Sequence, residues 1–304
     1  MAPFRAEQAT IFDLSSRTKL RVMGADRLRY LNGQLSNDLR KASDDSAIHA
    51  CVLSAKGKID ADVFIVADGE SFVIDSDAEL RETLAARLER YIIADDVQVE
   101  DITERFALFH ALGRGVAEMY RGAKAVAADR FGCAGTDLWL KREEYARAAQ
   151  ELASKFIIAD ETTAEAIRIE RGVPRWGHEL SGEIIPTEAN LESVAIDYAK
   201  GCYIGQEVIS RIKMSGQTNK RLCGLLPLSN HQLRSGMRLF SISDGKDVGW
   251  ITSVALSNSI GKQIALGFVK RGYQAAGSQL EAREANAATD GTAGSVEIAA
   301  LPFV

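Results

Sequence analysis

The sequence is poor in the features that mark several classes of protein. Proline is rare, with 5 residues in 304, no short unit recurs at a fixed period, and the apolar content is an ordinary 46%. These numbers exclude a disordered chain and a fibrous repeat. Apolar runs such as Val63 to Ala67 stop at an aspartate, far short of the roughly 20 residues of a transmembrane helix. The composition therefore indicates a soluble globular protein.

Cysteine and histidine are scarce, and their spacing is unlike that of a metal site. The 4 cysteines form no CxxC pair, and the 4 histidines are isolated along the chain. We therefore expect no metal ligands, and free thiols in a reducing compartment. Residues 1–10 hold no apolar stretch typical of a secretory signal. We expect a cytoplasmic protein with no membrane partner.

The net charge is small and negative, -5 with a pI of about 5.6, so direct nucleic-acid binding is not expected. Residues 200–221 depart from this balance, because five cations and one anion give them a local charge of +4. The cations are Lys200, Arg211, Lys213, Lys220 and Arg221, and the anion is Glu207. Such a patch suits a carboxylate or phosphate ligand, or it is the solvated face of a helix.

Residues 10–215 alternate strand-like and helix-like patterns. Thr10 to Met23 predicts a strand pair, and residues 48–53, 60–67 and 71–75 predict an antiparallel ribbon. Asp26 is expected to cap a helix that extends to Leu39, and Ser76 to Glu79 reads as a capping box. Hairpins take the place that crossover helices hold in a doubly wound fold, so the pattern favours an α+β class.

After Leu222 the sequence changes character. Short apolar runs alternate with Gly, Asp, Asn and Ser, with little helical periodicity, which is typical of a small β-barrel. The polar stretch from Ser215 to Lys220 resembles a linker. We therefore divide the chain into residues 1–215, interpreted as two interleaved subdomains, and a C-terminal barrel domain at 216–304.

The most unusual segment is KGCYIGQE, Lys200 to Glu207, which we call the octet. The apolar spacing after it predicts a helix that starts near Gly205. A cysteine just before that start, near Lys200, would have its thiolate favoured by the helix dipole. The alternative is that Cys202 is a small buried hydrophobe, the usual state of a free cysteine.

A second segment, Arg168 to Leu180, places Glu170 in the last turn of a helix, where the dipole disfavours a carboxylate. Arg171 could offset this cost as a plain surface partner. Alternatively, Glu170 could accept two parallel N–H donors from a ligand, such as the aminopyrimidinone edge of a pterin.

Together these segments resemble the YgfZ family of folate-binding proteins, relatives of the aminomethyltransferase (T-protein) of the glycine cleavage system. The resemblance covers nearly the whole chain, and its most specific piece is the octet followed by Arg211. Supporting stretches are LNGQ at 31–34, KGKI at 56–59, ERGVPRWGHEL at 170–180 and VGWITS at 248–253.

The resemblance implies a three-lobed body of antiparallel sheets and packed helices with a C-terminal β-barrel. It also implies a central channel that holds tetrahydrofolate, and a role in assembly or repair of iron-sulfur proteins, with these proteins or their assembly factors as partners. Glu170 would hold the pterin edge, and Cys202 would be the functional thiol. The residues that would shape the channel mouth are Lys200, Tyr203, Gln206, Glu207 and Arg211.

One departure from the family pattern concerns activity. T-proteins carry paired aspartates on a first-domain strand, one of them near the reacting folate nitrogens, whereas this chain has Ala61 and Asp62 there. Asp62 could supply the carboxylate, or it could be an exposed strand residue. We therefore do not expect a classical enzyme. The alternatives are a folate-dependent aminomethyltransferase and a tRNA-modification factor.

Overall fold

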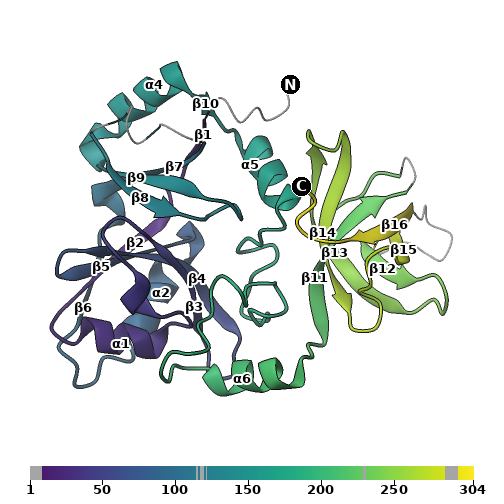
Figure 1. Cartoon of the computed structure of the whole chain (residues 1–304), viewed down its shortest axis with the longest axis horizontal. Helices are drawn as coiled ribbons and strands as arrows, with labels where there is room; N and C mark the ends of the chain where they lie inside the picture. The colour runs from purple at the N-terminus through teal and green to yellow at the C-terminus, as the bar shows by residue number, and fades with distance from the viewer. Residues whose placement is uncertain (1–8, 114–115, 117–119, 121, 229–230, 285–293) are drawn as a thin grey trace.

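The computed structural model describes residues 9–113, 116, 120, 122–228, 231–284 and 294–304. Two five-stranded sheets and a closed six-stranded barrel form the architecture. Figure 1 shows the two sheets stacked on one side of the molecule and the barrel on the other, with α5 and α6 between them. The α+β class with a C-terminal barrel is therefore confirmed.

The first sheet is antiparallel, with the order β3-β4-β5-β2-β6. Its strands are β2 (Thr18–Met23), β3 (Ile48–Leu53), β4 (Ile59–Asp68), β5 (Ser71–Ser76) and β6 (Gln98–Asp101). Helices α1 (Arg27–Gln34) and α2 (Arg81–Glu89) cover one face, where Leu31, Leu84 and Leu88 pack on Val63 and Ile65. The opposite face carries Asp62, Phe64 and Val66 of β4 toward the second sheet and the cavity described below.

The second sheet has the order β10-β1-β7-β9-β8, with β10 parallel to β1 and the other pairs antiparallel. Its strands are β1 (Thr10–Asp13), β7 (Phe106–Leu112), β8 (Lys124–Ala128), β9 (Gly135–Lys141) and β10 (Ile157–Ile158). Helix α4 (Tyr145–Lys155) packs on its outer face through Leu152. The inner face meets the first sheet through Val66, Val73, Leu108 and Trp139.

Helix α5 (Glu161–Glu170) leads out of the second sheet, and α6 (Gln206–Ser215) leads into the barrel. Residues 171–205 between them form neither an α-helix nor a named strand. Ile169 of α5 packs with Ile264 and Leu266 of the barrel, so this helix joins the two bodies. Single 3₁₀ turns at Leu39–Lys41, Ala78–Leu80, Thr103–Arg105 and Arg142–Glu144 are further helical elements of the described residues.

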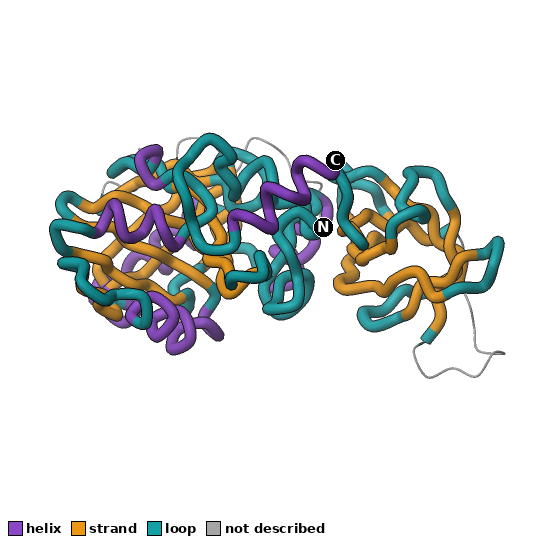
Figure 2. The backbone as a smooth tube through the Cα atoms, turned by 90° about the horizontal axis from the view of Figure 1, so that it is seen from below, coloured by secondary structure: helices purple, strands orange, loops and turns teal. Residues whose placement is uncertain are grey.

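The barrel closes in the order β11-β14-β13-β12-β15-β16. Its strands are β11 (Lys220–Pro227), β12 (Arg238–Ser241), β13 (Asp247–Ser257), β14 (Lys262–Lys270), β15 (Gln279–Arg283) and β16 (Gly294–Ala299). Figure 2 shows it as a separate body beside the stacked sheets. Within the described ranges, every helix is too short or too polar to cross a lipid bilayer.

Three local expectations from the sequence are corrected. Strands β1 and β2 do not pair with each other, since each joins a different sheet. Helix α1 ends at Gln34, and the Asp26 side chain accepts from the Asp96 amide instead of capping it. The capping box is also absent, because Ser76 belongs to β5 and the side chain of Asp77 caps the next turn.

Candidate functional site

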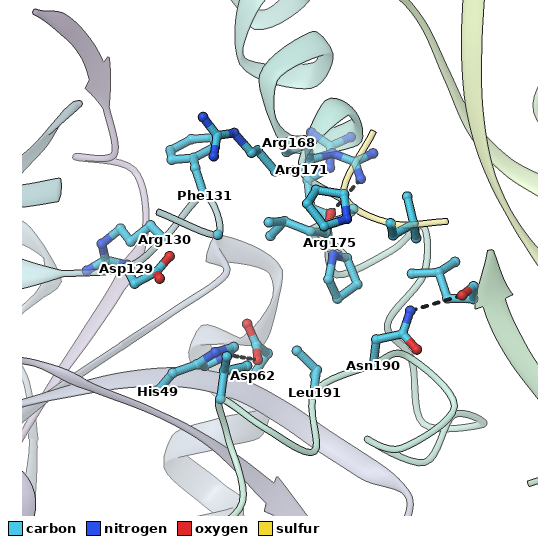
Figure 3. A pocket seen from close by; sticks show the side chains of 18 of the residues that line it. His49, Asp62, Asp129, Arg130, Phe131, Arg168, Arg171, Arg175, Asn190 and Leu191 are labelled. Carbon is cyan, nitrogen blue, oxygen red and sulfur yellow. Dashed lines mark hydrogen bonds and ion pairs between the residues drawn. The ribbon is translucent and has the colours of Figure 1, made fainter. Parts of the chain in front are cut away.

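A cavity of about 1140 Å³ lies where the first sheet, the end of α5, residues 190–194 and the barrel meet. We call it the central cavity. Its charged and aromatic lining includes Arg17, His49, Asp62, Phe64, Asp77, Asp129, Arg130, Phe131, Glu165, Arg168, Arg171, Arg175, Trp176, Glu192 and Arg221. Figure 3 shows His49 and Asp62 side by side on one wall and Arg168, Arg171 and Arg175 on the wall that α5 supplies. Of the predicted site residues, Asp62 is in this lining.

His49 and Asp62 form a close pair on neighbouring strands. The β3–β4 register sets His49 opposite Phe64, which places Asp62 diagonally across on the same face. The distance from His49 Nε2 to Asp62 Oδ1 is 2.5 Å. The His49 ring also stacks on Phe64 with a centroid distance of 4.5 Å and an angle of 4°. An acceptor and a titratable ring are therefore fixed together on the cavity wall.

A buried ion cluster centred on Arg130 packs against this wall. Arg130 donates to both oxygens of Asp75, at 2.6 and 3.0 Å, and to both oxygens of Asp137. Burial alone would raise the pKa of Asp137, but the Arg130 charge and the hydrogen bonds from His110 and Arg130 together outweigh it and lower that pKa to about 2. Arg130 also lies over the Phe64 ring, 4.3 Å from its centroid. One guanidinium thus links the two sheets to the aromatic floor of the cavity.

The opposite wall is rich in guanidinium groups that are only partly paired. Arg175 Nη1 contacts Glu165 at 3.0 Å, and no hydrogen bond or ion pair joins the Arg171 side chain to another described residue. Three buried lining atoms have no partner within the described chain, namely Arg17 Nη2, Arg175 Nε and Glu192 Oε2. Buried polar groups are normally satisfied. These three atoms are sealed from the cavity space, whereas Arg171 lies in the lining without a partner in the described chain and can meet an acidic ligand.

Glu170 lies outside this lining. Its Oε1 accepts from Ser257 Oγ at 2.5 Å and from the Ser259 amide, and its Oε2 accepts from Ser259 Oγ. These two serines of the barrel offset the unfavourable position at the end of α5. Both oxygens are occupied, so the geometry does not favour Glu170 as the holder of a pterin edge, which stays a prediction.

The octet forms a loop that leads into α6, as the sequence indicates, with Gly205 as the N-cap residue at φ 87°. Lys200 is buried, and its ammonium donates to the carbonyl oxygens of Asn32, Leu35 and Asn37 at 2.9, 2.7 and 2.7 Å. Burial lowers the pKa of Lys200 to about 8, although Asp38 and Asp197 oppose the shift. The Lys200 side chain therefore anchors the octet to the end of α1 through these hydrogen bonds.

Cys202 is exposed and does not line the central cavity. The cysteine in that lining is Cys223, and burial raises the pKa of its thiol to about 11. The sulfur of Cys202 is therefore open to a partner at the protein surface rather than to the contents of the cavity. The described residues contain no group of three or more His, Cys, Asp or Glu that could hold a metal ion.

The other octet positions also lie away from the cavity. Tyr203 is buried in an apolar cluster with Ile209, while Gln206, Glu207 and Arg211 belong to α6. None of them is in the cavity lining. The expectation that they shape the mouth of a channel is not met by this cavity and stays a prediction.

Two of the five cations behind the local charge of +4 have acidic partners in the folded chain, and a third is buried. Lys220 pairs with Glu188 at 3.6 Å, Arg221 pairs with Glu192 at 2.5 Å, and Lys200 is buried on carbonyl oxygens. Arg211 and Lys213 remain exposed, and Lys213 lies over the Tyr198 ring. The sequence count therefore overstates the attraction of this surface for an anion.

Sequence reasoning missed the residues that surround Asp62. A signal was present for His49, because a hairpin between the two predicted strands brings it near Asp62. No local pattern could reveal Arg130, whose partners lie on strands of two different sheets.

Comparison with known proteins places the chain in a family. Residues 5–129 match the GCVT N-terminal domain, and residues 220–304 match the glycine cleavage T-protein C-terminal barrel domain. The tRNA-modifying protein YgfZ of Escherichia coli O157:H7 is 30% identical over 252 residues, covering 74% of this chain and 73% of that protein. A mitochondrial iron-sulfur cluster assembly factor IBA57 homolog of Dictyostelium discoideum is 26% identical over 250 residues, 70% of this chain. The match spans 61% of the length of that relative.

A solved structure has the same fold. The aminomethyltransferase T of the glycine cleavage system from Bartonella henselae superposes with a TM-score of 0.86 at 19% identity, covering 98% of this chain and 86% of that one. The sequence resemblance to this family is confirmed. The chain therefore belongs to the YgfZ family, whose members share the architecture of the glycine cleavage T-protein.

Proposed function

We propose that this chain is a tetrahydrofolate-binding accessory protein for the assembly or repair of iron-sulfur proteins in the cytoplasm. The observation that carries the proposal is the central cavity, whose lining combines the Asp62 carboxylate, the Arg171 guanidinium and aromatic side chains. The matches to an iron-sulfur cluster assembly factor and to YgfZ support the cellular role.

The chemistry of the lining suits each part of a folate. Phe131 and Trp176 offer aromatic surface for a flat pterin or aryl ring. The Asp62 carboxylate can accept from ring N–H groups, and Arg171 can pair with a glutamate carboxylate. A volume of about 1140 Å³ lies just above the ~300–1,000 Å³ of ordinary ligand pockets, so a folate with its tail can enter.

Titration of the full chain with tetrahydrofolate tests this assignment. Arg171→Gln should weaken binding by about 1.5 to 3 kcal/mol, because a charged hydrogen bond to the ligand is lost. Arg147→Gln is the matched control, since Arg147 is an exposed partner of Glu144 on α4. Equal affinities of the two variants would remove Arg171 from the site, and no binding by the unaltered chain would end the proposal.

In this proposal the Cys202 thiol contacts the partner protein. Its exposure at the entry to α6 leaves the thiol accessible to an iron-sulfur protein or an assembly factor. In a strain that lacks the native gene and is defective in cluster enzymes, Cys202→Ser should fail to restore growth, whereas Cys133→Ser should restore it. Full rescue by Cys202→Ser would remove the thiol from the mechanism.

One observation favours an enzymatic alternative, a folate-dependent aminomethyltransferase. Asp62 lies in the cavity lining, where that reaction needs a carboxylate. Release of ammonia from an aminomethylated lipoyl carrier by the purified chain, lost in Asp62→Asn, would support the alternative. Absence of release with tetrahydrofolate bound would favour the accessory role.

A role as a tRNA-modification factor is the second alternative, because a relative carries that name. The pairing of Lys220 and Arg221 with acidic residues argues against direct tRNA binding. Filter binding of tRNA with a steep dependence on salt would contradict this argument, since phosphate contacts release counterions.

A further inference from the structure

We propose that residues 32–37 couple the central cavity to the octet, so that a ligand bound in the cavity slows the local opening of the octet around Cys202. These residues are the last turn of α1 and the three residues that follow it, and we call them the shared segment. The inference rests on the proposed function, because tetrahydrofolate is the ligand whose binding it describes.

The octet is attached to the shared segment on both sides of Cys202. Two residues before the cysteine, the Lys200 ammonium donates to three carbonyl oxygens of the shared segment, at 2.9, 2.7 and 2.7 Å. Two residues after it, the Ile204 amide donates to the Gly33 carbonyl oxygen at 3.1 Å. Local opening of the octet therefore requires both of these attachments to break.

The shared segment also reaches the central cavity, because Asn37 belongs to the cavity lining. Asn37 Nδ2 donates to the carbonyl oxygens of His49 at 2.8 Å and Val194 at 3.3 Å, and both of these residues are in the lining as well. One side-chain amide thus joins β3 to residues 190–194, while the carbonyl oxygen of the same residue accepts from Lys200. A ligand that lies on this wall restrains a residue that holds the octet.

Ser36 provides a second connection that does not depend on the Asn37 side chain. Ser36 is buried, and its Oγ donates to the Ala195 carbonyl at 2.6 Å and accepts from the Cys51 amide at 2.8 Å. Its carbonyl oxygen accepts from the Asp197 amide at 3.0 Å. The chain that runs from the cavity wall toward the octet is thus bonded to the shared segment. Hydrogen-bond networks of this kind carry energetic coupling between sites.

The coupling has a direction that a purely structural anchor lacks. A structural anchor would hold the octet equally well whether the cavity is empty or filled. A ligand that binds better when the wall is ordered favours the closed octet by the difference between its two affinities. Coupling between sites typically amounts to about 5- to 150-fold. The fixed presentation of Cys202 to a partner protein would then depend on whether the cavity is occupied.

Hydrogen exchange of the full chain, with and without saturating tetrahydrofolate, tests the coupling. The Ile204 amide should exchange at least about 5-fold more slowly with the ligand bound, because its bond to Gly33 opens less often. The Gly245 amide is the internal control, since it donates to the Ser241 carbonyl in the turn between β12 and β13 and should keep its rate. Equal slowing at Ile204 and Gly245 would indicate general stabilisation and overturn the inference.

Reciprocity between coupled sites gives a second measurement. Lys200 is not in the cavity lining, yet Lys200→Met should weaken tetrahydrofolate binding by about 5-fold or more, because the shared segment loses its ammonium partner. Lys213→Met is the matched control, since Lys213 is an exposed lysine of α6, and it should leave the affinity unchanged. If Lys200→Met does not fold, hydrogen exchange of the unaltered chain decides alone.

The outcomes separate this inference from the proposed function. If tetrahydrofolate binds but the Ile204 amide exchanges at the same rate with and without it, the coupling is overturned and the binding function stands. The same conclusion follows if folded Lys200→Met binds tetrahydrofolate as tightly as the unaltered chain. If the unaltered chain does not bind tetrahydrofolate, both proposals are overturned.

Discussion

The octet and the wall of the central cavity differ in how they are built. The octet is a continuous run with a distinctive sequence, yet its lysine is used to hold the end of α1 and its cysteine faces outward. The cavity wall has no such run, and its His49, Asp62 and Arg130 come from separate segments that the two stacked sheets bring together. A recognisable motif and the place where a ligand can be enclosed are thus different parts of this molecule.

The largest expected difference between the cavity wall and the octet comes from removing the Arg130 ion cluster. Arg130→Met leaves Asp75 and Asp137 buried without their shared partner, so the free energy of unfolding should fall by about 3 to 5 kcal/mol in urea denaturation. Arg147→Met, on an exposed pair, should change it by less than about 0.5 kcal/mol. A small effect of Arg130→Met would mean that the wall does not depend on this cluster.

Removal of the Lys200 ammonium should lower the free energy of unfolding by less than removal of Arg130. Lys200→Met leaves three carbonyl groups near the end of α1 without their donor, which should cost about 2 to 3 kcal/mol because part of this surface can recruit water. Lys213→Met, at an exposed position of α6, should be nearly neutral. An equally small effect of Lys200→Met would show that the octet is not anchored through its lysine.

Acid tests the ion cluster next to the cavity wall, because the pKa of Asp137 in that cluster is lowered to about 2. A carboxylate whose folded pKa lies below its unfolded value of about 3.9 stabilises the fold above that value, and the contribution is lost as pH falls toward 2. The unaltered chain should therefore lose about 2 kcal/mol more than Asp137→Asn between pH 5 and pH 2. Parallel stability curves for the two proteins would contradict the assignment.

The smallest expected effect concerns Asn190 in the cavity lining, which has a positive φ of 61°. Its side chain donates to the Leu222 carbonyl and accepts from Arg221, so it ties this wall to β11. Asn190→Gly loses the hydrogen bonds alone, whereas Asn190→Ala also strains the backbone. We expect alanine to be less stable than glycine by about 1 kcal/mol in urea denaturation. The reverse order would mean that the backbone relaxes.

The sequence predicted what local patterns encode. The barrel strands, the loop before α6 and the position of Glu170 at the end of α5 follow from apolar spacing and turn residues. The pairing of β1 and β2 was mispredicted, because adjacent strands in sequence can enter different sheets. The serines that satisfy Glu170 are more than eighty residues away along the chain, and no local signal links them.

The central claim is that tetrahydrofolate binds between the stacked sheets and the barrel, behind the octet and not at it. A crystal structure of the full chain with tetrahydrofolate tests this claim most directly. The account predicts ligand density in the central cavity, with the ring system within hydrogen-bonding distance of Asp62 and a carboxylate beside Arg171. Density at the surface next to Cys202, with none in the central cavity, would contradict it.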